Sequence, residues 1–267
     1  MIHKLLHPHH TFTVFKYGVY GALALNVWLF FREDWQAAVV MLDTAAPWAR
    51  LIEVFAQTID TFAWVVLLAL FELETSVLPD ATLRHPRVKW TLHGVRALCA
   101  LVILNSLAGY AGKYLGYLEA ERLTLEVCSL AGDGWFRLDA LDEFSPLDAG
   151  NCATLAGEEV FRLHGGQVVS SLAVLAEARW FALLDAVNAA AWILVVLVLE
   201  VDVRLQLRGV LRGTLWWTSG ACKLLLYAVL LLAVVLWAWD GDLLDFWDAL
   251  LWLLAELLRE IRTEVRK

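Results

Sequence analysis

The sequence predicts an all-α integral membrane protein, with about six transmembrane helices in a single membrane domain covering residues 1–267. Of these residues 60% are hydrophobic and only 19% are charged, whereas a soluble domain of this length needs more polar surface to cover its core. The 14 Trp residues agree with this class, because Trp concentrates at membrane interfaces. Membrane lipids are therefore expected partners. The net charge of −8 argues against nucleic acid, since binding phosphates requires a basic face.

A helix needs about 20 mostly apolar residues to cross the hydrocarbon layer. Five stretches meet this requirement, namely residues 13–31, 55–78, 94–115, 179–203 and 215–239. A sixth stretch, residues 243–261, is apolar but carries several charges. On a helix, Asp245, Asp248, Glu256 and Arg259 fall within a stripe of about 80°. Such a stripe suits a sixth span that faces the bundle interior, which we favour, or a helix that lies in the membrane interface.

The basic residues predict that the N- and C-termini are both cytoplasmic, in a multi-pass protein of the inner (plasma) membrane. The short connections at residues 79–90 and 204–214 are the most basic, with Arg84, Arg87, Lys89, Arg204, Arg208 and Arg212. Short cytoplasmic loops carry an excess of Lys and Arg. A sixth span also returns the basic C-terminal tail to the same side.

The connection at residues 119–178 is then an extracytoplasmic acidic loop. Its apolar stretch 168–176 is too short to span, and we expect a re-entrant or surface helix there. Cys128 and Cys152 both lie in this loop and are expected to form a disulfide worth roughly 3 kcal/mol. Two free thiols are the alternative, and a zinc site is disfavoured because no CxxC pair is present. Cys99 and Cys222 are expected to stay unpaired within spans.

A partial internal repeat relates the second and third spans to the fourth and fifth. Glu72 and Glu74 follow an Ala-Trp pair and seven apolar residues, and Glu200 and Asp202 follow a second such arrangement. Beyond each basic turn, a Trp-Thr pair precedes Arg96 in one half and Lys223 in the other at the same spacing. The matched helices run in the same direction, so the repeat is a parallel one, as in several transporter folds.

Charged and polar groups inside these spans are the candidate functional residues, because burying them in a membrane is costly. The charges at the turns have two interpretations: an ion pair near each turn, with Arg96 near Glu72 or Glu74 and Lys223 near Glu200 or Asp202, or a charged inner mouth that selects ions. The candidates for an ion path or its inner mouth are Glu72, Glu74, Arg96, Glu200, Asp202, Lys223, Asp245, Asp248 and Glu256. The intramembrane polar groups Asp60, Asn188 and Asn105 are expected to form interhelical hydrogen bonds rather than to bind a ligand.

No motif for catalysis, nucleotide binding, haem or a metal is present, so we expect no enzyme activity, no cofactor and no metal site. The leading function is an ion- or small-solute-conducting channel or transporter, expected as a homo-oligomer or with companion membrane subunits. The alternative is a non-catalytic scaffold or regulatory subunit of a larger membrane complex. An enzyme acting on lipids or quinones comes last, because no catalytic constellation supports it.

Overall fold

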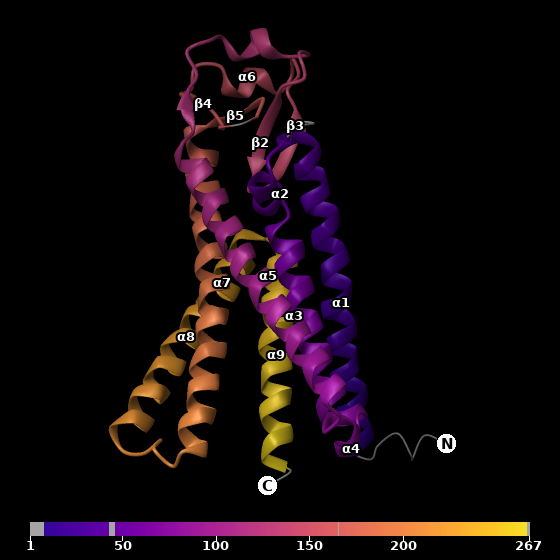
Figure 1. The fold of residues 1–267 in the computed structure, drawn as a ribbon. Coiled ribbons are helices and arrows are strands. Elements are labelled where there is room, and N and C mark those ends of the chain that lie inside the picture. The colour runs from indigo at the N-terminus through magenta and orange to yellow at the C-terminus, as the bar shows by residue number, and fades with distance from the viewer. Residues whose placement is uncertain (1–7, 43–45, 165, 266–267) are drawn as a thin grey trace. The chain divides into compact units, whose positions relative to one another are not determined.

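The computed structural model describes residues 8–42, 46–164 and 166–265, and it is 75% helical. Figure 1 shows the elements in chain order. The helices are α1 (Pro8–Met41), α2 (Trp48–Val54), α3 (Ala56–Glu72), the π-helical η2 (Leu73–Val77), α4 (Asp80–Leu83), α5 (Pro86–Leu118), the 3-10 helix η3 (Val127–Leu130), α6 (Cys152–Leu155), α7 (Leu172–Leu207), α8 (Thr214–Asp240) and α9 (Leu243–Val265). The strands are β1 (Glu121–Arg122), β2 (Phe136–Ala140), β3 (Glu143–Pro146), β4 (Val160–Arg162) and β5 (Val168–Ser171).

Five of the described helices are long and apolar enough to cross a membrane, in agreement with the five clear stretches of the sequence. They are Phe12–Met41, Ala56–Val77, Pro86–Leu118, Leu172–Leu207 and Thr214–Asp240. Several exceed the hydrocarbon thickness: α7, with 36 residues, is about 54 Å long at 1.5 Å per residue. α9 is helical but is not among these five, because charged residues interrupt its apolar surface. Six spans and the cytoplasmic position of the termini therefore stay predictions. The first and last residues lie outside the described ranges.

The chain forms two compact units. One consists of Met1–Asn26 with Val187–Lys267, and the other of Val27–Ala186. The long helices α1 and α7 contribute to both units. A single membrane domain stays a prediction.

In the unit Val27–Ala186, helix α2 packs closely on α5 because glycines replace side chains at the contact. A Cβ atom on Gly109 would lie 2.7 Å from the carbonyl oxygen of Ile52, and one on Gly112 would lie 2.8 Å from Oε1 of Glu53. Both distances are shorter than packed atoms allow. The two glycines thus bring a polar helix end next to α5, as small residues do where membrane helices meet.

Residues 119–171 form a small β domain, here called the cap, at one end of α5 and α7. Its five strands have the order β1-β4-β5-β2-β3, and β2 pairs with β5 in parallel while the other pairs are antiparallel. Leu138, Leu163 and Val168 of the cap share a core with Tyr117 of α5 and Leu175 of α7. The cap is therefore packed onto the helices of its own unit.

The expected surface or re-entrant helix at residues 168–176 is wrong. Residues Val168–Ser171 form strand β5, and α7 begins at Leu172. All four strand residues are buried, since β5 lies between β4 and β2. Because β5 is buried on both faces, its sequence Val-Val-Ser-Ser shows no alternation of apolar and polar residues. The periodicity of this short stretch therefore does not distinguish a strand from a helix.

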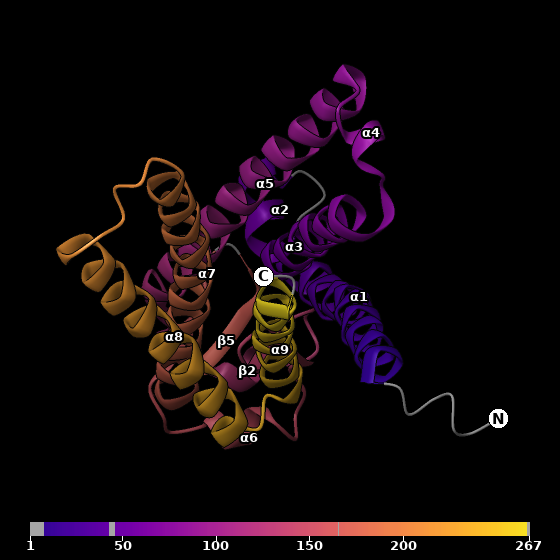
Figure 2. The ribbon, with the colours of Figure 1, turned by 90° about the horizontal axis from the view of Figure 1, so that it is seen from below.

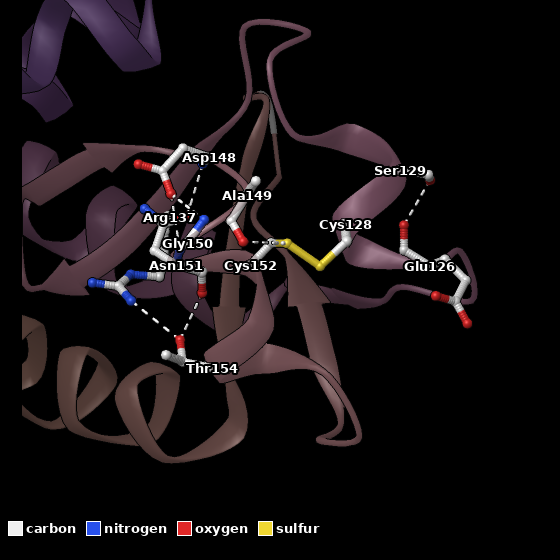
Figure 3. Close-up of a disulfide and its surroundings, with 10 residues drawn as sticks. All are labelled: Glu126, Cys128, Ser129, Arg137, Asp148, Ala149, Gly150, Asn151, Cys152 and Thr154. Carbon is white, nitrogen blue, oxygen red and sulfur yellow. Dashed lines mark hydrogen bonds between the residues drawn. A yellow bond between two sulfur atoms is a disulfide. The ribbon is translucent and has the colours of Figure 1, made fainter.

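The predicted disulfide between Cys128 and Cys152 is present, with the two Cα atoms 5.1 Å apart. It joins η3 to α6, as Figure 3 shows. Cys152 packs in a second core of the cap with Leu147, Val160 and Val169. Cys99 and Cys222 are free, the former buried and the latter exposed.

In the other unit, α7 and α8 form a hairpin whose connection Figure 2 shows clearly. Ala191 and Val195 of α7 are buried against Leu230 of α8. Gly209 and Gly213, with φ of 69° and 58°, allow the chain to reverse within a few residues, because only glycine adopts this left-handed region readily.

Candidate functional site

A buried lysine lies where the cap meets α5. Lys113 is 8% exposed, and its Nζ lies 2.5 Å from Oδ2 of Asp142. Asp142 occupies the turn between β2 and β3 with φ of 61°, a left-handed conformation that Asp and Asn adopt more readily than other non-glycine residues. The turn thus places a carboxylate beside a buried cation on α5, a candidate membrane span.

A second buried carboxylate lies on α1. Asp34 is 1% exposed, and its Oδ2 accepts a hydrogen bond of 3.0 Å from the backbone N–H of Thr58 and one of 2.6 Å from its hydroxyl. Thr58 belongs to the first turn of α3, whose N-cap residue Phe55 provides no side-chain cap. Asp34 therefore caps α3 from another helix, where a negative charge also stabilises the N-terminal end of the helix dipole.

Two arginines make hydrogen bonds between neighbouring elements of this region: Arg50 links α2 to the cap, and Arg179 links α7 to the end of α5. Arg50 of α2 pairs with Glu53 at 2.7 Å and donates to the carbonyl oxygen of His164 in the cap at 3.0 Å. Arg179 of α7 donates to the carbonyl oxygen of Tyr117 at 2.8 Å. The last carbonyl groups of a helix lack intrahelical partners, so Arg179 satisfies one at the end of α5.

A small cavity of about 30 Å³ lies beside Lys113, Asp142, Arg50 and Glu53, and both charged and apolar side chains line it. Its lining consists of Ala37, Met41, Arg50, Glu53, Val54, Lys113, Gly116, Tyr117, Asp142, Leu163 and His164. The volume exceeds the ~10–15 Å³ that one water requires, and the walls offer several polar partners. Asp34 and Asp185 also act electrostatically on Lys113. Among the lining residues, the carboxylates Glu53 and Asp142 pair with Arg50 and Lys113 respectively.

The predicted ion pair in the α3–α5 hairpin is present. Arg96 of α5 pairs with Glu74 of η2. Glu72 is buried at the end of α3. Residues two apart on a helix point in nearly opposite directions, so the side chains of Glu72 and Glu74 leave the helix on different faces.

The corresponding pair in the α7–α8 hairpin is also present. Asp202 of α7 accepts from Nζ of Lys223 at 2.8 Å and from the hydroxyl of Ser219 at 2.6 and 2.7 Å. Glu200 instead pairs with Arg204 one turn later, at 2.8 Å. Within the described part of the chain, each hairpin thus carries a cross-helix ion pair, as expected from the repeat in the sequence. A role of these residues in an ion path stays a prediction.

On α9, Oδ1 of Asp248 accepts a hydrogen bond of 2.9 Å from the amide of Asn26 on α1, within the same unit. Asp245 lies in the first turn of α9, and Glu256 is partly buried further along it. Asp60 of α3 and Asn188 of α7 are partly buried, whereas Asn105 lies on an exposed face of α5. The expected interhelical hydrogen bonds of these three residues stay predictions.

The sequence interpretation missed Asp34, Lys113 and Asp142. A detectable signal was present for Lys113, an isolated charge between Gly112 and Gly116 in an apolar helix, because closely spaced small residues indicate a helix contact. No comparable signal marked Asp142, whose position depends on the β2–β3 turn.

Comparison with protein-family models, curated proteins and solved structures gives no match. The fold and the site define the class: a mainly helical protein with five described helices apolar enough to cross a membrane, a disulfide-linked β cap, and buried charges where helices and cap meet.

Proposed function

We propose that this protein carries a small cation across a membrane, and that the cavity beside Lys113 is the outer part of its path. The observation that supports this proposal is the group of buried charges around a water-sized cavity, formed by residues of candidate membrane spans and the cap. Buried charges in membrane helices are expensive and are usually retained for function.

Stability alone is a poor explanation for this arrangement. A buried ion pair is often no more stabilising than apolar residues of the same volume. Lys113 and Asp142 could therefore be replaced by a hydrophobic contact if α5 and the cap only had to pack. The cavity beside them gives these charges a second use, because it has room for a water molecule that can hydrate a passing ion.

The sign of the charge favours cations over anions. Lys113 and Arg50 are each paired with a carboxylate, Asp142 and Glu53 respectively. Asp34 and Asp185 add further negative charge near Lys113. An anion entering this region would meet net repulsion, whereas a cation or a proton would be attracted.

In this proposal the cap is extracytoplasmic, both termini are cytoplasmic, and α9 is a sixth span of an inner-membrane protein. The pairs Glu74–Arg96 and Asp202–Lys223 then lie near the cytoplasmic ends of their own hairpins. The partial parallel repeat agrees with transporter architecture. A homo-oligomer of the chain is the expected working form.

The test is ion flux into liposomes that contain the purified protein. Asp34→Asn retains an oxygen that can accept from Thr58 but removes the charge, so cation flux should fall while the fold persists. The control is Asp133→Asn, the same substitution at an exposed cap residue, for which flux should be unchanged. Glu256→Gln examines α9 in the same way and should also weaken cation flux if the polar stripe lines the path.

Ion flux through the unmodified protein distinguishes the transport function from the scaffold or regulatory function. Flux equal to that of empty liposomes, across several cations and voltages, would exclude the transport proposal. Stoichiometric foreign subunits after gentle purification would then favour the scaffold or regulatory role.

A further inference from the structure

An open groove of about 290 Å³ lies between α7 and α8, close to the turn that joins them. Its wall includes the aliphatic residues Leu197, Val201, Leu205 and Leu215, together with Asp202 and Cys222. Most of this surface is aliphatic, and both helices are apolar enough to lie in a membrane. This volume is just below the roughly 300–1,000 Å³ of small-molecule sites, so the groove suits one chain of a larger amphiphile.

The carboxylate that lines this groove is already neutralised. Asp202 is 7% exposed and accepts from Lys223 and Ser219. On the neighbouring face of α7, Glu200 is paired with Arg204. These four charged side chains therefore contribute almost no net charge beside the groove.

The turn next to the groove keeps an uncompensated positive charge. Arg208 and Arg212 are exposed, and neither forms an ion pair with a residue in the described part of the chain. Trp216 and Trp217 are exposed at the start of α8. Exposed Trp beside Arg is typical of the level of lipid headgroups.

We propose that the α7–α8 groove and its turn bind one anionic phospholipid of the surrounding membrane. An acyl chain occupies the aliphatic groove, and Arg208 and Arg212 hold the phosphate and the remaining negative charge of the headgroup. Arginine suits this role because its planar guanidinium donates two parallel hydrogen bonds to a phosphate. A zwitterionic lipid offers the same chain but no net charge. Basic sites between membrane helices recognise anionic headgroups in this way.

Cys222 lines the groove and is a free, exposed thiol, so it can report occupancy. In a Cys99→Ser background, the rate of maleimide labelling of Cys222 is measured in detergent with increasing phosphatidylglycerol or phosphatidylcholine of identical chains. Phosphatidylglycerol should slow labelling at a lower concentration than phosphatidylcholine. Arg208→Gln with Arg212→Gln should weaken this protection by about fivefold for each arginine.

The basic turn of the other hairpin provides a matched control. Arg84→Gln with Arg87→Gln removes the same charge from another unit of the chain, and protection should change by less than twofold. The proposal is overturned if neither lipid slows labelling, if both lipids protect equally, or if the two double variants lose protection alike. Protection by inorganic phosphate alone would also overturn it, because phosphate does not fill an apolar groove.

Discussion

The ammonium of Lys113 on α5 lies 2.5 Å from the carboxylate of Asp142, which the β2–β3 turn presents from the cap. The two residues are 29 positions apart in the chain. Both side chains are largely shielded from solvent. The pair therefore joins a candidate membrane helix to the cap. Removing either partner would leave the other charge buried without a counter-ion, which is energetically costly.

Asp142→Asn should lower the free energy of unfolding by about 3–5 kcal/mol, because it leaves the Lys113 ammonium buried without its counter-ion. Asn tolerates the left-handed backbone conformation of this position. The loss of stability would therefore come from removing the negative charge and not from backbone strain. Thermal or denaturant unfolding in detergent measures the change. Glu159→Gln, which breaks the exposed pair with Arg122, is the control and should have little effect.

Combining Asp142→Asn with Lys113→Met should recover much of that lost stability. The double variant has no unpaired charge, and the four proteins form a double-mutant cycle that isolates the interaction. A double variant as unstable as the sum of the two single variants would show that the residues act independently, contrary to the structure.

Asp34→Ala should destabilise the protein by about 0.5–2 kcal/mol, since α3 loses the hydrogen bonds that Asp34 accepts at its first turn. Asp34→Asn should cost less, because its amide oxygen can still accept from Thr58. Stability and cation flux therefore respond differently: Asn should preserve the fold but reduce flux. Equal unfolding midpoints for Asp34→Ala and the unmodified protein would contradict the capping role.

Removal of the disulfide with Cys128→Ser and Cys152→Ser should cost roughly 3 kcal/mol, given a separation of 24 residues. The loss should be confined to the cap, and proteolysis within residues 119–171 should become faster. In the unmodified protein, Cys222 should react with a thiol reagent first, and Cys128 and Cys152 only after reduction. Reaction of Cys128 without reductant would contradict the disulfide.

Reporter fusions test the proposed topology. Fusions within residues 84–89 and after Lys267 should report the cytoplasm, and a fusion near Gly150 the opposite side. A signal from the same side at all three points would exclude this arrangement. A non-cytoplasmic signal after Lys267 alone would show that α9 does not cross the membrane.

The features that the sequence determined are local. The length of an apolar run decides whether a helix can cross a membrane, so five candidate spans were predictable. Glu74–Arg96 and Asp202–Lys223 were also predictable, because the partners are separated by 22 and 21 residues within one hairpin. The disulfide followed from two cysteines in one polar connection.

Other features were decided only by the tertiary structure. The buried residues 168–171 form a central strand because β4 and β2 pair with them on either side. Asp34 meets Thr58, Lys113 meets Asp142, and Asn26 meets Asp248 across 222 residues. Each of these contacts joins two residues that are far apart in the sequence. No local sequence pattern links the two partners, so the contact depends on how the helices and turns that carry them pack together. The sequence specifies the cost of burying these charges, and the packing of distant elements decides which partner neutralises each one.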